Sequence, residues 1–175
     1  MNLDLRYPIG RFNKGIKVME PLIQEFINDI ESLPGLLESE VFSLNKVQLD
    51  TPYREAGWTI RQVVHHLPDS HLQAYVRFKL ALTEENPAIK TYKENLWAEL
   101  KDTFETPIEV SLQLLDSLHK RWTVLLKSLS PEQFDKTFYH PDWEAISLRT
   151  TLALYAWHGK HHLAHITKLK ERMGW

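Results

Sequence analysis

The sequence contains no cysteine among its 175 residues. A disulfide framework is therefore excluded, and the chain must fold on its hydrophobic core alone, as suits a protein of a reducing compartment. A structural zinc site built from thiolates is excluded for the same reason. Any metal ion would have to be held by histidine, aspartate or glutamate.

The sequence also lacks a strong net charge and any long apolar run. Its formal charge is −2 and its pI is near 6.5, which gives no electrostatic reason to expect nucleic acid or an anionic membrane as a partner. The apolar runs are too short to span a bilayer, and residues 1–8 have no signal-peptide character. We therefore expect a cytoplasmic protein, folded as a single domain over 1–175 with an irregular arm at residues 1–14.

Alternation of apolar and polar residues, the pattern of a half-buried strand, is scarce, whereas helical spacing recurs throughout the chain. Thr59 and Gln62 match a capping box at the start of one helix. Pro34 and Gly35 predict a kink or a break in another. We expect an all-α four-helix bundle. Its long helices should cover about 19–44, 60–82, 107–129 and 147–172, with a short helix in 91–100 and a connecting segment over 131–147.

Four of the nine histidines fall within residues 158–165. In a helix, His158 and His162 project from one face one turn apart, as do His161 and His165. Two imidazoles with this spacing can bind one metal ion. A helical wheel places the first pair nearer the apolar face, so we expect His161 and His165 to lie outside the ligand set or to be exposed. Gly159 excludes a zincin motif, because it occupies the position of that motif's glutamate.

A second histidine cluster lies upstream and could supply a third ligand. His71 points into the apolar face of its helix, whereas His66 falls on a polar stripe with Asp69. That stripe is either a solvated surface or the wall of a polar cleft. The spacing alone does not choose among His65, His66 and His71. His119 lies on an apolar stripe and is predicted to be a core residue.

Several motifs together resemble the YfiT-like branch of the DinB superfamily. They occur in order along nearly the whole chain, at residues 7–10, 48–54, 57–67, 140–142, 157–166 and 172–175. The resemblance implies a four-helix bundle of DinB topology that is often a homodimer. It also implies one divalent ion, zinc or nickel, bound by His66, His158 and His162. Pro68 departs from the motif's usual alanine and should bend the helix close to His66.

The resemblance further implies a metal-dependent hydrolase that acts on a small-molecule substrate. Three neutral ligands leave a position for water, whose pKa a metal ion can lower to about 7. Asp69, His161 and Asp142 are candidates for orienting that water or carrying protons. One alternative is transfer of a low-molecular-weight thiol, such as bacillithiol, to an electrophile. A second alternative is a bundle that binds metal without catalysis.

Overall fold

The computed structural model describes residues 4–175, so the first three residues of the expected arm lie outside the described part. Four long helices dominate, and they are joined by shorter elements. In chain order the elements are α1 (Glu20–Val41), α2 (Lys46–Leu49), α3 (Ile60–Thr83), α4 (Glu94–Trp97), α5 (Lys101–Glu105), α6 (Ile108–Lys127), the 3-10 helix η1 (Pro131–Asp135), β1 (Thr137–His140), β2 (Glu144–Ser147) and α7 (Leu148–Met173).

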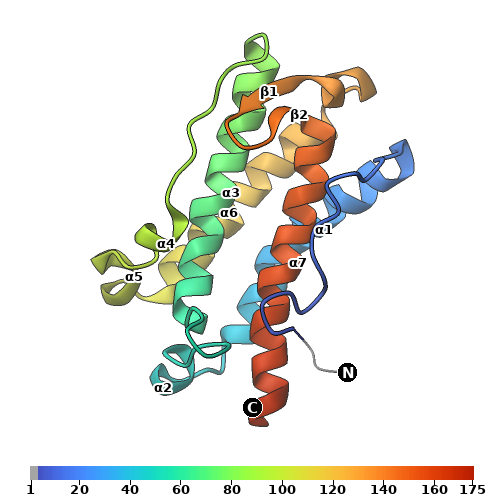
Figure 1. Cartoon of the computed structure of the whole chain (residues 1–175). Helices are drawn as coiled ribbons and strands as arrows, with labels where there is room; N and C mark the ends of the chain where they lie inside the picture. Colours follow the sequence, from blue (N-terminus) through green and yellow to red (C-terminus); the bar gives the residue numbers. More distant parts are fainter. Residues whose placement is uncertain (1–3) are drawn as a thin grey trace.

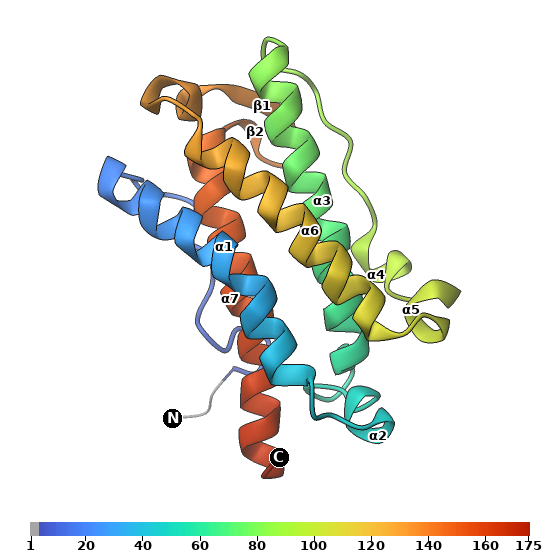
Figure 2. The ribbon, with the colours of Figure 1, turned by 180° about the vertical axis from the view of Figure 1, so that it is seen from behind.

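The long helices form a four-helix bundle, as the sequence predicts. Helix α1 packs against α6 and α7, and α3 packs against the same two helices (Figures 1 and 2). Helices α1 and α3 are therefore diagonal to each other, and so are α6 and α7. Both the α1-to-α3 and the α6-to-α7 connections cross a diagonal, whereas a simple up-and-down bundle joins neighbours.

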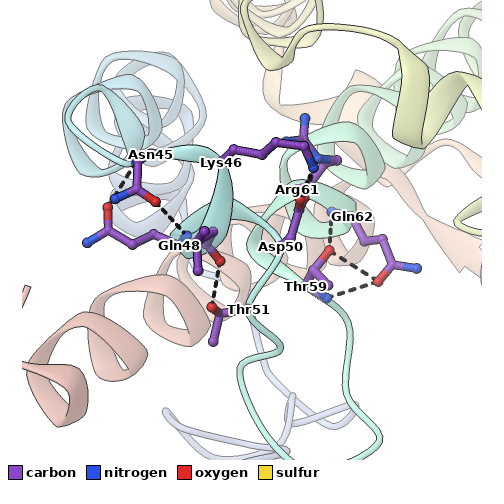
Figure 3. A network of polar contacts seen from close by, with 9 residues as sticks. Asn45, Lys46, Gln48, Asp50, Thr51, Thr59, Arg61 and Gln62 are labelled. Carbon is purple, nitrogen blue, oxygen red and sulfur yellow. Dashed lines mark hydrogen bonds and ion pairs between the residues drawn. The ribbon is translucent and has the colours of Figure 1, made fainter.

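Local side-chain hydrogen bonds fix where α2 and α3 begin (Figure 3). The Thr59 hydroxyl accepts from the backbone N–H of Gln62, and the Gln62 side chain accepts from the backbone N–H of Thr59, which confirms the predicted capping box. Asn45 and Gln48 form a second capping box at α2. The Arg61 guanidinium pairs with Asp50 at 2.7 Å. The first turn of α3 is thus anchored just before the upstream histidines.

Helix α1 is a single helix that runs through Pro34, which excludes a break, one of the two outcomes predicted at Pro34–Gly35. Proline has no N–H, which leaves the carbonyl four residues earlier, on Ile30, without its helical donor. The His119 side chain of α6 supplies the missing donor, with Nδ1 2.5 Å from the Ile30 oxygen. Tertiary contact thereby compensates the local defect. Helix α3 likewise continues through Pro68.

The segment 131–147 contains structure that the sequence analysis missed. Strands β1 and β2 form an antiparallel hairpin in which Phe138 pairs with Ile146, and both side chains are buried. Four residues per strand are too few for a reliable alternation pattern. The region expected to hold one short helix contains α4, followed by α5.

A layer of histidines divides the core into two apolar clusters. One cluster, at the hairpin end, includes Phe78, Trp122 and Leu152, and the other includes Leu67 and Leu115. Four histidines lie between these clusters along their helices: buried His71 on α3, buried His119 on α6, and half-buried His158 with buried His162 on α7. No helix in the described part of the chain has the length and apolar character needed to cross a membrane.

Candidate metal centre

A cleft of about 360 Å³ opens beside α3 and α7. The N-terminal arm covers it from one side, running alongside α7 (Figure 1). A tight turn over residues 51–58 covers it from another: the Tyr53 N–H donates to the Trp58 carbonyl at 3.0 Å, and the Gly57 N–H donates to the Arg54 carbonyl at 3.0 Å. The lining includes Arg6, Tyr7, Tyr53, Arg54, Trp58, Glu94, Trp157 and five histidines, namely His66, His158, His161, His162 and His165.

Three of these imidazoles converge from two helices. One ligand nitrogen from each of His66, His158 and His162 lies within 4.8 Å of the other two. The Nε2 atom of His158 is 3.3 Å from that of His66 and 3.1 Å from that of His162. Metal–nitrogen bonds of about 2.0–2.1 Å in tetrahedral geometry place ligand nitrogens about 3.4 Å apart. The spacing therefore fits a single small divalent ion.

Burial keeps these three side chains neutral. It lowers the pKa of His66 to about 4, and it lowers the pKa values of His158 and His162 well below the ordinary histidine value. A neutral imidazole has one nitrogen lone pair, and this is the form that binds metal. The Nδ1 atom of His162 is buried without a hydrogen-bond partner. Imidazole nitrogens suit zinc, nickel, copper or iron, so the donor set fits the implied metal.

A chain of hydrogen bonds determines which nitrogen of His158 carries the proton. The Ile30 carbonyl only accepts, so His119 must donate to it from Nδ1. Neutral His119 then accepts at Nε2 from Nδ1 of His71, 2.9 Å away. Neutral His71 in turn accepts at Nε2 from Nδ1 of His158, 3.2 Å away. The lone pair of His158 is therefore left on Nε2, the atom that faces His66 and His162.

The second histidine pair on α7 lies outside the converging set, as one of the two predicted alternatives has it, and it is buried rather than exposed. His161 and His165 have Nε2 atoms 3.0 Å apart and exposed fractions of 8% and 3%. Tyr53 stacks on His165 with ring centroids 3.8 Å apart, and Trp157 stacks on His161 at 4.6 Å. Helical periodicity could not reveal this cover, because Tyr53 comes from the turn over residues 51–58.

The other candidate residues lie at different distances from the cleft. His161 lines it. Asp142 is exposed and lines an adjoining cavity that also reaches His158. Asp69 is not among the residues that line the cleft. Burial, together with the like charge of Asp102, raises the pKa of Asp69 to about 6. The converging set does not include His65 or His119. His65 is hydrogen-bonded to Ser111 at 2.7 Å, and His119 is a core residue.

Sequence reasoning did not single out the side chains that cover the site. Tyr7, Tyr53 and Arg54 line the cleft from segments without regular secondary structure. These residues fall in the motifs at residues 7–10 and 48–54, which carried the family resemblance but indicated no role at the site. The Arg172 guanidinium of α7 donates to the Tyr53 carbonyl at 2.6 Å, so the C-terminal motif helps to hold this cover in place.

Comparison with known proteins shows which family the chain belongs to. The sequence profile of the DinB superfamily matches residues 29–166. The chain belongs to the DinB superfamily. This DinB protein is 55% identical over 172 residues to a protein of Bacillus mycoides and 56% identical over 172 residues to one of Bacillus cereus. Each match covers 98% of this chain and 99% of the relative, and both relatives are provisionally named metal-dependent hydrolases.

Solved structures support the same bundle for this DinB protein. YfiT from Bacillus subtilis, described as a probable metal-dependent hydrolase with an unusual four-helix bundle topology, matches with a TM-score of 0.95 and 50% identity. That match covers 98% of this chain and 99% of YfiT. TT2238, a four-helix bundle protein, matches with a TM-score of 0.60 at 18% identity, covering 83% of this chain and 98% of TT2238. The second likeness concerns the fold alone.

Proposed function

We propose that this protein is a metal-dependent hydrolase whose divalent ion, zinc or nickel, is held by His66, His158 and His162. The observation that carries the proposal is the convergence of three neutral imidazoles in an open cleft. The provisional names of close relatives point to the same class of activity. Three protein ligands, rather than four, are typical of catalytic metal sites, since a position remains for the reacting group.

The chain's own residues would divide the work as follows. His66, His158 and His162 bind the ion, and His71 with His119 keep the proton on the far nitrogen of His158. When bound, the cation supplies a Lewis acid and lowers the pKa of water to about 7. Trp58, with its ring centroid 4.7 Å from that of His66, limits the access of bulk water.

His161 is the proton carrier that the geometry favours. It lines the cleft next to His162, and its Nδ1 atom is buried without a hydrogen-bond partner. Burial lowers its pKa to about 4, so the ring is neutral near pH 7 and readily passes on any proton that it takes up. Asp142 could act only through the adjoining cavity, and the proposal gives no catalytic role to Asp69.

The size and lining of the cleft favour a small-molecule substrate. Aromatic rings of Tyr7, Tyr53, Trp58 and Trp157 contribute apolar walls, and Arg6 and Arg54 contribute positive charge. A few polar groups among apolar walls are typical of small-molecule sites.

Transfer of a low-molecular-weight thiol, such as bacillithiol, is the second candidate. A cavity of about 640 Å³ adjoins the cleft at His158, which provides room for a second reactant. The same ion would lower the pKa of a thiol. Assays with ester and amide substrates, run in parallel with a thiol plus an electrophile, separate the two activities. Turnover only in the presence of thiol would replace hydrolysis by transfer.

The metal site itself is tested by elemental analysis of untagged protein after gel filtration. We expect about one ion per chain in the wild type and near-complete loss in His158→Ala. His161→Ala is the matched control, because it removes an imidazole of the neighbouring pair on the same helix. We expect this control to retain its metal and to lose activity. Equal metal content in wild type and His158→Ala would contradict the ligand assignment, and a metal-loaded protein without any turnover would leave a metal-binding bundle.

A further inference from the structure

The adjoining cavity contains a charged group that no carboxylate of residues 4–175 neutralises. Arg77 of α3 lines this cavity together with Tyr92, Tyr155 of α7 and His158. The side chain is buried, with Arg77 9% exposed. Within residues 4–175 its only hydrogen bond is a long one, from Nη1 to the Tyr155 hydroxyl at 3.4 Å, and its Nε atom is buried without any partner there.

Two half-buried arginines, Arg61 and Arg149, show what Arg77 lacks, whereas half-buried Arg54 in the metal cleft likewise has no carboxylate partner among residues 4–175. Arg61 pairs with Asp50 at 2.7 Å, and Arg149 pairs with both Glu20 and Asp135. Over residues 4–175, no carboxylate lies within ion-pairing distance of Arg77. A guanidinium has five N–H donors and keeps its charge at any physiological pH. A buried charge without a partner is strongly unfavourable, so such a group indicates a missing anion.

Two tyrosine hydroxyl groups line the same cavity as Arg77, together with Ser70 and Thr91. The Tyr92 hydroxyl is buried without a hydrogen-bond partner, and the Tyr155 hydroxyl is the acceptor of the long contact from Arg77. Burial raises the pKa of both tyrosines, which therefore remain protonated and able to donate. The acidic groups of the cavity, Glu94 and Asp142, are exposed to solvent and unpaired with Arg77. Three side chains thus offer hydrogen-bond donors that the protein leaves unused.

We propose that this cavity binds an anionic oxygen group, a carboxylate or phosphate, of a small molecule. Arg77 supplies the charge, and its planar fork suits the two oxygens of such a group. Tyr92 and Tyr155 supply neutral donors beside it. Because the cavity reaches His158, the remainder of a bound molecule can extend into the metal cleft. The binding site goes beyond the proposed hydrolase activity and does not require it.

Titration calorimetry of the full-length protein tests the site with probes of defined charge. Succinate and inorganic phosphate represent the two sources of anionic oxygen, and succinamide is the uncharged match of succinate. We expect the wild type to bind at least one anion but not succinamide, and Arg77→Met to weaken that binding by at least about tenfold. Lys79→Met is the matched control, because it removes an exposed positive charge two residues along the same helix. It should bind like the wild type.

The melting temperature of the ligand-free variants distinguishes a binding arginine from a purely structural one. Replacement of a structural arginine would lower the melting temperature. Removal of an unpaired buried charge should leave the melting temperature of Arg77→Met at or above that of the wild type. Arg77→Lys keeps the charge but not the fork, so it should bind anions more weakly than the wild type and more tightly than Arg77→Met. Unchanged anion binding in Arg77→Met, a lower melting temperature, or equal binding of succinamide would each overturn the proposal.

The same titrations distinguish this site from the metal site. Anion binding is measured first in metal-free protein and then in His158→Ala. We expect both to retain it, because the arginine and the two hydroxyls remain. Loss of anion binding in either would overturn an independent site, whereas loss of hydrolysis alone concerns only the proposed function.

Discussion

Helix α7 carries two histidine pairs that differ only in their surroundings. His158 and His162 have Nε2 atoms 3.1 Å apart, and His161 and His165 have Nε2 atoms 3.0 Å apart. Both pairs use the same i, i+4 spacing and both are neutral. The first pair meets a third imidazole, His66 of α3, whereas the second meets the ring of Tyr53. Identical spacing on a helix therefore prepares two ligands but does not decide whether a metal site forms.

The far sides of the two pairs differ as well. His158 is tied through His71 and His119 to a backbone carbonyl, so its proton position is fixed. His161 has a buried Nδ1 atom without a partner. A fixed tautomer favours metal binding, whereas a ring nitrogen without a partner is free to exchange a proton. Under the proposed function, the first pair would hold the ion and the second pair would assist the reaction.

Removal of the third imidazole should erase the difference between the pairs and have the largest effect. We expect His66→Ala to lose nearly all bound metal, because neither pair alone offers three ligands. Elemental analysis of gel-filtered, untagged protein measures this. His165→Ala removes one imidazole from the second pair and should keep its metal. Full metal content in His66→Ala would mean that two imidazoles of α7 suffice.

Interruption of the hydrogen-bond chain should weaken the first pair without touching any of its ligands. We expect His119→Phe to lower metal affinity by about 10–100-fold, since outer hydrogen bonds orient a ligand. It should also lower stability by about 1–3 kcal/mol, because the Ile30 carbonyl loses its donor. His119→Asn can still donate to that carbonyl but cannot reach His71.

Competition titrations with a chelator and thermal unfolding separate these two effects. His119→Asn should show the loss of affinity with little loss of stability. Unchanged affinity in both variants would show that the hydrogen-bond chain does not orient His158. Both pairs would then be held in the same way, and only His66 would distinguish them.

A bulkier residue at position 159, beside both pairs on α7, should have a smaller effect and lower the stability of the fold. A Cβ atom at Gly159 would lie 2.5 Å from Cδ2 of Leu33 on α1. We expect Gly159→Ala to cost about 1 kcal/mol, because overpacking exceeds the gain in helix propensity. Gly35→Ala, which meets nothing within 4 Å, should instead stabilise the protein slightly. Thermal unfolding measures both, and a stabilised Gly159→Ala would show that Leu33 moves freely.

Removal of a charge on α3 leaves both histidine pairs intact and should have the smallest effect, which is on stability alone. The raised pKa of Asp69, about 6 against 3.8, means that the unfolded chain releases this proton before the folded protein does. Stability therefore falls as the pH rises through that window. We expect Asp69→Asn to melt higher than the wild type at about pH 7 and equally below about pH 4.

The same variant tests whether Asp69 takes part in the reaction. Metal content and turnover should remain unchanged in Asp69→Asn. Asp102→Asn should reproduce part of the stability gain, because it removes the like charge but not the burial. Loss of metal or of turnover in Asp69→Asn would show that this carboxylate takes part in metal binding or catalysis, although it does not line the cleft.

Much of the fold could be predicted from local pattern. The capping box at Thr59 and the apolar periodicity of the four long helices predicted the bundle, because helix ends and amphipathic faces are encoded in nearby residues. At Pro34 the local pattern could not decide between a kink and a break. The local penalty of the proline is real, but His119 of another helix compensates it. The hairpin of β1 and β2 was missed because its pairing partners are short and its burial depends on the bundle.

The sequence by itself determined that the protein forms an amphipathic helical bundle, that any metal site must use imidazole or carboxylate, and that α7 presents two imidazole pairs. These properties follow from composition and from residues within one helical turn of each other. Only the tertiary structure decided that His66 meets the first pair, that Tyr53 covers the second, and that Arg77 lacks a counterion. Those outcomes depend on contacts between segments distant in the chain, and local spacing carries no information about which side chains packing brings together.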